Sequence, residues 1–405
     1  MYTFAIQLID LIKLRYIQLF AVFFVLSWAI YLTKLIYSSK YWGIKFKDYD
    51  FKGKVSVLIP VVDEDEEVWK KVLESIKNGL KNVKHEVIVI ANGKNGEENI
   101  KLALKYGFKV IRLSEASKRK AIEAGVEKAT GEITIILDSD TIVLEDSIKK
   151  LLKPFRNPQV GGTTPRHIIF NRKRSLYTRI SDWLEDIRFN EVVAGQSIHG
   201  AVSCLPGRLL AVRTNLLKRL VPELVNQKFL GARCISGDDR FLTSWLLERG
   251  YYTAYVPESV VMTNAPETLE AFVKQRLRWS RTSLRETIRS LGWIWNYPFT
   301  AFTTISNVVL RWLFFAVIIL ALFKWVGIIN IPHYVNFTWY FVSFGTIAGF
   351  FISGFLRQFR HIYRYPEDLL YLPLFLIVTT FILTPVEWLG NITLKESKWM
   401  TRNTK

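Results

Sequence analysis

Two aspartates separated by a single serine, Asp138 and Asp140, follow directly after the apolar run Ile133–Leu137. Like charges at this spacing repel one another, and the repulsion raises a carboxyl pKa. A hard divalent cation such as Mg²⁺ or Mn²⁺ removes that cost and can bridge a diphosphate. The alternative is a capped turn in which Asp140 begins the next helix. We expect Asp138 and Asp140 to bind a metal ion.

A second acidic pair follows a glycine, in the segment Ser236-Gly237-Asp238-Asp239-Arg240. A carboxylate in such a pair can serve as a general base that accepts a proton from a hydroxyl group. The same pattern also fits the start of a helix, with Asp239 and Arg240 in surface salt bridges. Both interpretations stay open at this point.

A third segment, Gln275-Arg276-Leu277-Arg278-Trp279, combines two arginines with an aromatic ring. Guanidinium groups bind phosphate oxygens in pairs, and an indole can stack on the apolar face of a sugar ring. The alternative is a stretch on the membrane surface whose arginines contact lipid headgroups. The first interpretation predicts a site for a phosphate-bearing substrate.

The elements that must position these motifs alternate between strand and helix patterns. Between residue 52 and about residue 289 the chain lacks long apolar runs, and the alternation is clearest in the first half of this segment. Strands that alternate with helices predict a mainly parallel sheet covered on both faces, and ligands bind beyond the carboxyl ends of such strands. The predicted strands are 55–62, 86–90, 110–113 and 132–137, and the predicted helices are 64–80, 97–106 and 117–130.

Four apolar runs outside this segment are each long enough to cross roughly 30 Å of hydrocarbon as a helix. Buried helices of a soluble protein are the alternative, but four of them in one soluble chain would be unusual. We therefore expect a membrane anchor in residues 1–50, a soluble domain in 51–274, interfacial amphipathic helices in 275–300 and a membrane region in 301–405. The predicted transmembrane helices are 17–36, 305–328, 337–356 and 369–388.

Composition narrows the class of protein. The chain has 405 residues, half of them hydrophobic, and a formal net charge of +19. The basic excess fits loops on the inner side of a membrane, anionic lipid headgroups or an anionic substrate, whereas no basic–aromatic motif of a nucleic-acid-binding module is present. Two cysteines, Cys204 and Cys234, cannot form a disulfide framework, which fits a domain that faces the cytosol. We expect no nucleic-acid partner.

The three motifs, in this order, resemble those of the processive family-2 glycosyltransferases, and of hyaluronan synthases in particular, with cellulose and chitin synthases as further similar enzymes. The resemblance extends from about residue 55 to residue 402. It implies an α/β catalytic domain of the GT-A fold, the fold of nucleotide-diphospho-sugar transferases, combined with α-helical transmembrane segments.

The resemblance also implies roles for individual residues. Asp239, the last acid of its motif, matches the general base of the family, and Asp138 and Asp140 match the motif that binds donor and metal. Cys204 begins a loop that resembles the acceptor entrance. The residues expected to bind substrate are Asp63, Asn92, Lys118, Asp138, Asp238, Cys204, Gln275, Arg276, Arg278 and Trp279.

Three of these residues lie at positions where this chain differs from the usual residues of the family, either at the position itself or beside it. Asp63 follows the first strand, whose acidic residues lie near the uridine in the family. Asn92 stands where the family often has an aspartate that contacts the base. Lys118 matches the lysine beside the donor, although Ser117 replaces the preceding glycine.

The function that this resemblance implies is inverting transfer of a sugar from a nucleotide-sugar, expected to be a UDP-sugar, to a growing polysaccharide that is then exported. The metal ion, Arg276 and Arg278 would stabilise charge on the leaving diphosphate while Asp239 accepts the proton. One alternative is a non-processive glycosyltransferase that acts on a lipid carrier or glycolipid. The other is a membrane receptor or transporter without enzymatic activity.

Membrane topology follows from the same resemblance and from the distribution of charge. We expect a multi-pass protein of the cell membrane whose catalytic domain faces the cytosol, where nucleotide-sugars are made. One N-terminal and three C-terminal spans would place both chain ends outside, yet Lys395, Lys398 and the Trp-x-x-Arg element of Trp399 and Arg402 favour a cytosolic C-terminal end. We therefore expect one apolar stretch, with residues 293–308 as a candidate, to lie in the interface or to enter without crossing.

Overall fold

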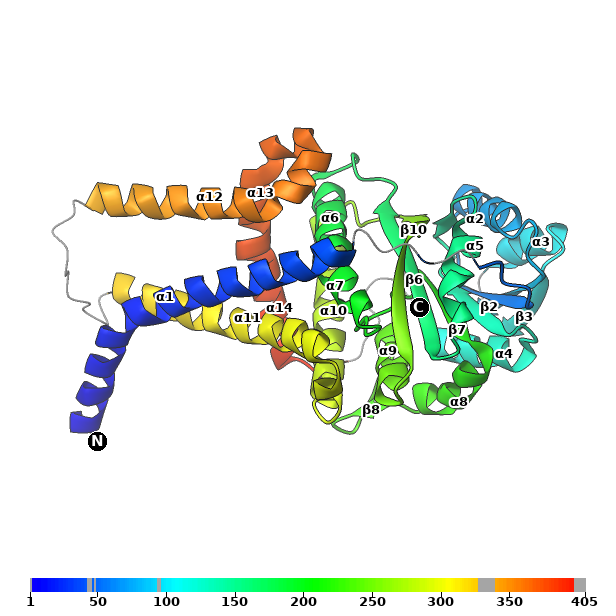
Figure 1. Ribbon diagram of the computed structural model, residues 1–405, viewed down its shortest axis with the longest axis horizontal. Helices are drawn as coiled ribbons and strands as arrows, with labels where there is room; N and C mark the ends of the chain where they lie inside the picture. Colours follow the sequence, from blue (N-terminus) through cyan, green and yellow to red (C-terminus); the bar gives the residue numbers. More distant parts are fainter. Residues whose placement is uncertain (1, 42–45, 47–48, 93–95, 327–338, 397–405) are drawn as a thin grey trace. The chain divides into compact units, whose positions relative to one another are not determined.

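The computed structural model describes residues 2–41, 46, 49–92, 96–326 and 339–396 (Figure 1). The chain divides into two compact units. The helical unit consists of Met1–Ile36 and Ala301–Thr384, and the α/β unit consists of Tyr37–Thr300 and Pro385–Lys405. All motifs singled out above belong to the α/β unit.

An eight-stranded sheet forms the centre of the α/β unit, in the order β3-β2-β1-β4-β7-β6-β10-β5. The neighbours β3–β2, β2–β1, β1–β4 and β6–β10 are parallel, whereas β7 is antiparallel to β4 and β6, and β5 is antiparallel to β10. The mainly parallel sheet expected from the sequence is therefore confirmed. The strands are β1 (Val55–Val61), β2 (His85–Asn92), β3 (Lys109–Leu113), β4 (Ile133–Leu137), β5 (Ile142–Val143), β6 (Val160–Ile169), β7 (Leu209–Arg213) and β10 (Tyr252–Thr263), and a separate pair is formed by β8 (Lys228–Phe229) and β9 (Ala232–Arg233).

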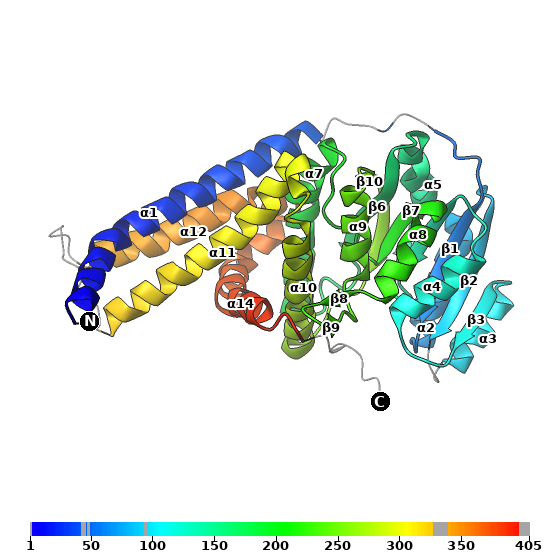
Figure 2. The same cartoon turned by 90° about the horizontal axis from the view of Figure 1, so that it is seen from below.

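The central strands are buried on both faces, as their almost continuous aliphatic sequences predict. Leu58 of β1 belongs to a core with α4, α8 and α9, while its neighbours Val57 and Ile59 belong to a second core with α2 and α5. The helices α4 and α8 lie side by side in both views (Figures 1 and 2). The helices of this unit include α2 (Glu66–Gly79), α3 (Glu97–Lys105), α4 (Lys118–Lys128), α5 (Ser147–Leu152), α6 (Leu176–Ile187), α7 (Ala194–Ile198), α8 (Thr214–Val225), α9 (Asp238–Glu248) and α10 (Leu269–Ser290).

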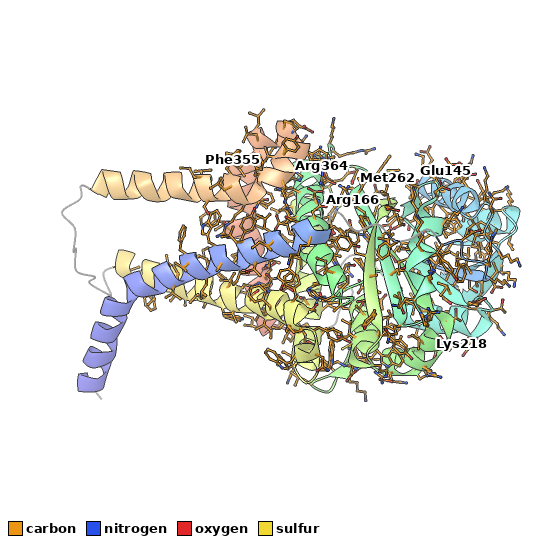
Figure 3. The ribbon with its side chains drawn as sticks, viewed as in Figure 1. Glu145, Arg166, Lys218, Met262, Phe355 and Arg364 are labelled. Carbon is orange, nitrogen blue, oxygen red and sulfur yellow. The ribbon has the colours of Figure 1, made fainter. Side chains whose placement is uncertain are left out.

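These helices are amphipathic, and α8 shows the pattern. It buries Leu216, Leu217 and Leu220 and exposes Lys218, which points away from the sheet (Figure 3). Apolar residues at this spacing face one side of a helix, so the sequence pattern alone places the helix on the sheet.

Capping side chains fix where the helices begin. The carboxylate of Asp65 accepts hydrogen bonds from the backbone N–H groups of Glu67 and Val68, so α2 begins at Glu66 and not at residue 64. Ser117 caps α4, and Thr268 caps α10. Because α4 begins with Lys118 and α10 carries the arginine motif, these caps set the position of two parts of the expected site.

The helical unit contains α12 (Trp339–Arg364), most of α1 (Tyr2–Tyr41) and α11 (Pro298–Trp325), and the short helices between residues 366 and 383. Within the described part of the chain, three helical stretches are long and apolar enough to cross a membrane: Val22–Tyr41, Pro298–Leu320 and Pro366–Ile392. The predicted run at 337–356 begins outside the described residues, and its remainder lies in α12. The domain boundaries given above stay predictions.

Side chains within the helical unit link α1 to α11 and α12. The rings of Phe23 and Phe314 stack with centroids 5.5 Å apart. The ammonium of Lys34 donates to the side-chain oxygen of Asn307 at 2.7 Å. Arg357 donates to Ser27 Oγ at 2.8 Å, so the N-terminal helix packs on the C-terminal helices of this unit.

Candidate active site

A lysine joins two of the expected acidic residues. Lys118 Nζ lies 2.6 Å from Asp138 Oδ1 and 3.3 Å from Asp238 Oδ2. Asp138 follows β4, Lys118 begins α4 and Asp238 begins α9, so three separate segments meet at the carboxyl end of the central strands. We call the four aspartates beside this lysine, Asp138, Asp140, Asp238 and Asp239, the acidic cluster.

The charges of this cluster act strongly on one another. Burial raises the pKa of Asp138 and outweighs the effect of Lys118, and the carboxylate of Asp140 raises it further. Burial acts in the same direction on Asp238, but there Lys118 and Arg119 outweigh it and lower the pKa. Burial alone would lower the pKa of Lys118, yet the neighbouring carboxylates raise it, so this lysine stays charged. Asp138 keeps 34% of its side chain exposed and is accessible to a ligand.

The backbone of the segment 204–208 holds Asp239. Gly207 donates its N–H to Asp239 Oδ2 at 3.1 Å, and Cys204 Sγ lies 3.9 Å from the same oxygen. A Cβ at Gly207 would lie 3.1 Å from Lys118 Nζ and 3.5 Å from Asp239 Cβ, so a larger residue would crowd both groups. Burial, reinforced by Asp239, raises the pKa of Cys204 to about 11, which makes it a neutral thiol.

The start of α9 depends on the glycine before the acidic pair. Gly237 has φ +87°, a left-handed conformation that residues with a Cβ rarely adopt. Asp239 therefore lies in the first turn of α9, where the helix dipole favours a negative charge. The pair thus begins a helix, as one interpretation of this segment expects, and it also faces Lys118 and Gly207. The role of Asp239 as a general base stays a prediction.

The two arginines of α10 face different charges. The pKa of Arg278 is lowered by burial, and the carboxylates that oppose this most are Asp239 and then Asp238 and Asp138. The pKa of Arg276 is lowered by burial to about 10, and its main opposing carboxylate is Glu185. Since two residues correspond to about 200° around a helix, the two guanidinium groups point to different sides. Only Arg278 faces the acidic cluster.

Trp279 lies on the side of α10 that carries Arg276. The guanidinium of Arg276 lies 5.0 Å from the centre of the indole, and that of Arg208 lies 5.5 Å from it. Arg208 also forms an ion pair with Glu185 at 3.2 Å, and Arg188 approaches the same carboxylate at 3.5 Å. We call Glu185, Arg188, Arg208 and Arg276 the arginine cluster.

Sequence reasoning named Arg276 but missed the other three residues of the arginine cluster. Glu185 and Arg188 lie on or just after α6, in a stretch dense with charges of both signs, and nothing in their spacing distinguishes them. Arg208 lies four residues after Cys204, in the same segment. Its backbone oxygen accepts from the N–H of Asp138 at 3.0 Å, so this residue connects the two clusters.

At the ends of β1 and β2, the structure shows contacts that the motifs did not indicate. Asp63 is exposed, and it is the next residue, Glu64, whose carboxylate accepts from Ser139 Oγ at 2.7 Å. Asn92 is buried, and its side-chain oxygen accepts from the backbone N–H of Ser117 at 2.8 Å. These bonds fix the turn between Asp138 and Asp140 and the start of α4.

The remaining expected residues are placed only in part. Gln275 lies half-buried on α10, one turn before Arg278 and on the same side of the helix. Trp399 and Arg402 lie outside the described residues.

Asp138 and Asp140 fit a divalent cation of the kind that shares its coordination with a substrate. Mg²⁺ in phosphate-transfer sites commonly takes one or two carboxylates and completes its shell with phosphate oxygens and water. Nowhere in the described ranges do three or more His, Cys, Asp or Glu side chains form a metal-holding group. Burial is the main cause of the raised pKa of Asp138, and the repulsion of Asp140 adds to it; a cation would remove both costs.

Comparisons with known proteins assign the family. Residues 53–282, more than half of the chain, match the model described as glycosyltransferase like family 2. The chain is 27% identical to a hyaluronan synthase of Streptococcus pyogenes over 377 residues, covering 89% of this chain and 87% of that protein. It is 27% identical to an N-acetylglucosaminyltransferase of Rhizobium meliloti over 355 residues, covering 86% and 81%. The chain belongs to the family 2 glycosyltransferases.

A solved structure agrees on the fold. A mannosyltransferase from Pyrobaculum calidifontis, in complex with GDP-Man and Mn²⁺, superposes with a TM-score of 0.64 at 15% identity, covering 95% of this chain and all of the other. The expected GT-A fold and family are confirmed, and the protein is a glycosyltransferase. The three apolar helices found among the described residues and the similarity to hyaluronan synthase indicate a membrane protein.

Proposed function

We propose that the protein transfers a sugar from a UDP-sugar, with inversion, to a growing polysaccharide. One observation carries this proposal: Lys118 pairs with Asp138 and Asp238 at the carboxyl ends of the central strands, and Gly207 holds Asp239 beside them. Such a site can hold a sugar-diphosphate and a base within reach of the same bond. The name of one relative, hyaluronan synthase, supports polymerisation, and the resemblance of the motifs to that family supports a UDP-sugar donor.

The donor's diphosphate would lie between Lys118 and Arg278. Both cations face the acidic cluster, and Arg278 Nε is buried without a hydrogen-bond partner in the part of the chain that the structure describes. A buried guanidinium with an unused N–H is suited to bind a phosphate oxygen. A Mg²⁺ or Mn²⁺ ion held by Asp138 and Asp140 would supply further neutralisation of the leaving diphosphate.

Asp239 would act as the general base. Its Oδ2 accepts from Gly207 and faces the thiol of Cys204, whereas its Oδ1 accepts from the N–H of Arg240 and keeps a second lone pair for the acceptor hydroxyl. The two N–H bonds fix the orientation of the carboxylate before the acceptor binds. Proton removal then makes the hydroxyl nucleophilic as it attacks the anomeric carbon opposite the diphosphate.

A second candidate function is non-processive transfer to a lipid carrier or glycolipid. The observation that favours it is the similarity to an N-acetylglucosaminyltransferase of Rhizobium meliloti, whose name states sugar transfer without a polymer product. The two functions differ in product length, since only polymerisation yields chains that grow while the enzyme retains them.

We also propose a multi-pass topology with the α/β unit in the cytosol. Thr300 and Pro385 both belong to this compact unit, so the chain between them crosses the membrane an even number of times. Residues 385–396, the C-terminal segment, bind α10: Arg281 pairs with Glu396 at 2.6 Å, and Ser280 donates to the backbone oxygen of Glu387. These contacts support a cytosolic C-terminal end and one apolar stretch that does not cross. Reporter fusions after residue 405 should give the cytosolic signal.

The proposal is tested with the purified full-length protein and a panel of nucleotide-sugars, with Mn²⁺ or Mg²⁺ present. We expect release of UDP together with a product many sugars long. A single added sugar on a lipid would select the second candidate function, and the absence of nucleotide release from every donor would refute both.

A further inference from the structure

The arginine cluster contains more positive charge than its surroundings neutralise. Three guanidinium groups surround Glu185, whose carboxylate is 3% exposed. Burial would raise the pKa of Glu185, but Arg208 and Arg188 outweigh it and lower the pKa to about 2, so this carboxylate is charged at neutral pH. One negative charge thus faces three positive charges.

The other groups beside the cluster change this balance little. His167 is neutral, because burial and Arg208 lower its pKa well below the usual value. Cys204 is a neutral thiol. Glu387 is a further carboxylate that acts on Arg276, and Asp239 acts on Arg188, but each ranks behind Glu185. A net positive charge remains.

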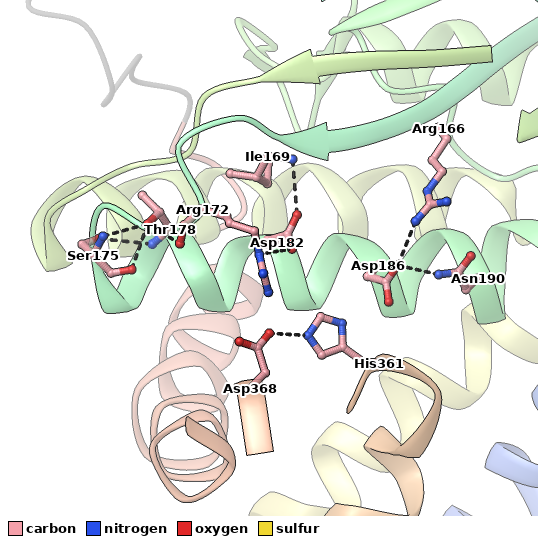
Figure 4. A network of polar contacts seen from close by, with 10 residues as sticks. All are labelled: Arg166, Ile169, Arg172, Ser175, Thr178, Asp182, Asp186, Asn190, His361 and Asp368. Carbon is pink, nitrogen blue, oxygen red and sulfur yellow. Dashed lines mark hydrogen bonds and ion pairs between the residues drawn. The ribbon is translucent and has the colours of Figure 1, made fainter. Parts of the chain in front are cut away.

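Hydrogen bonds hold α6, which carries Glu185, firmly against the sheet. Asp182 accepts from the backbone N–H of Ile169 and from Arg172, and Asp186 accepts from Asn190 and pairs with Arg166 (Figure 4). These bonds occupy the carboxylates on either side of Glu185 along the helix. The arginine cluster therefore rests on a fixed support, which favours a defined binding geometry.

One donor of the cluster has no acceptor. Arg276 Nε is buried and makes no hydrogen bond within the described residues, whereas the buried Arg208 Nη1 lies 3.2 Å from Glu185 Oε1 in an ion pair. Buried donors are almost always satisfied, and the exceptions commonly mark a ligand or ion. Arg188 keeps 31% of its side chain exposed, so the cluster is open to solvent on one side.

We propose that the arginine cluster, with Trp279, binds an acidic group on the acceptor. This inference rests on the proposed function, in which the acidic cluster takes the donor. The diphosphate is then bound on the Arg278 side of α10, whereas Arg276 and Trp279 face away from it. The acidic group is the carboxylate of a uronic acid residue or the phosphate of a lipid-linked sugar, since both present oxygens that guanidinium groups bind in pairs.

The test is binding by titration calorimetry, which needs no turnover of a donor. The full-length protein in detergent is titrated with an oligosaccharide ending in a uronic acid and with its carboxyl-reduced form. It is also titrated with a polyprenyl-phosphate-linked sugar and the same sugar on a neutral lipid. We expect one acidic ligand to bind about 10- to 100-fold more tightly than its neutral partner. The pair that shows the preference identifies the source of the acidic group.

Variants then identify the residues that cause the preference for the acidic ligand. Arg208→Gln and Arg276→Gln should each reduce it about tenfold or more, while Arg208→Lys retains part of it. Arg249→Gln is the matched control, because Arg249 also lies over a tryptophan ring, Trp245 at 3.9 Å, but belongs to neither cluster. Equal affinity for the acidic and neutral members of both pairs would overturn the inference. Nucleotide release from the donor is measured in parallel, so that failure of the proposed function is seen separately.

Discussion

The two sides of α10 carry opposite excess charge. On the Arg278 side, four aspartates face one lysine and one arginine, and on the Arg276 side, three arginines face one glutamate. An excess of carboxylates suits a divalent cation, and an excess of guanidinium groups suits an anion. Under the two proposals above, one helix would separate the donor from an acidic acceptor by charge, and Asp239, on the Arg278 side, also acts on Arg188.

The largest expected effect comes from removing the base on the acidic side. Asp239→Asn keeps the shape of the side chain and one of its two backbone hydrogen bonds, because only the amide oxygen can accept an N–H. It can no longer accept a proton, so we expect transfer to fall by about 10²- to 10⁴-fold. Donor affinity should stay close to that of the wild type. The measurement is turnover beside equilibrium donor binding.

The matched control for this substitution is Asp146→Asn. Asp146 is exposed and has φ +60°, a conformation that asparagine tolerates well. Transfer by this variant should equal that of the wild type. If Asp239→Asn also transferred sugar normally, the base would have to be sought elsewhere.

A somewhat smaller loss is expected when Asp140 is replaced. Asp140→Ala removes one of the two carboxylates proposed to hold the cation, and loss of one electrostatic partner of the leaving group typically costs about 10²–10³ in rate. Donor binding should weaken together with turnover and should need more Mn²⁺ to saturate. Full activity of the wild type in excess chelator would remove the metal from the mechanism.

On the arginine side, the next prediction concerns stability. Glu185→Gln leaves Arg208 and Arg188 without their shared carboxylate, and breaking a buried ion pair in this way costs about 3 kcal/mol. We expect a lower melting temperature of the purified protein. Glu248→Gln serves as the control, because Glu248 pairs with Arg249 at 3.3 Å on the surface, where such a pair contributes little.

The stabilisation that Glu185→Gln removes depends on pH. The pKa of Glu185 is about 2 in the folded protein and near 4.5 when unfolded, a difference that corresponds to roughly 3 kcal/mol. Because the folded value is lower, this stabilisation is present above pH 4.5 and is lost as the pH falls toward 2. The gap in melting temperature between wild type and Glu185→Gln should therefore narrow over that range, and a constant gap would contradict the role of the charge.

The two sides also differ in how far the sequence predicts them. Asp138 and Asp140 follow a strand whose aliphatic run is unambiguous, and the carboxyl ends of parallel strands meet at one edge, so their neighbourhood could be predicted from local pattern. Glu185, Arg188 and Arg208 come together only because α6 and the segment 204–208 pack beside α10. No periodicity encodes that packing. Helical spacing places Arg276 and Arg278 on different sides of α10, but for the same reason it could not show which charges each of them would face.

The smallest effect concerns the turn that presents the two metal-binding carboxylates. Ser139 lies between them and donates to Glu64 at 2.7 Å, and its side chain is buried. Ser139→Ala removes one hydrogen bond and leaves a carboxylate oxygen of Glu64 without this donor, so we expect a loss of about 1 kcal/mol in stability and a severalfold rise in the KM for the donor. The control is Ser181→Ala, because Ser181 Oγ is buried with no hydrogen-bond partner in the described part of the chain. If Ser139→Ala bound donor as well as Ser181→Ala does, the turn would be held by the strand ends alone. The sheet would then position the carboxylates of the acidic side, as α6 positions Glu185 on the arginine side.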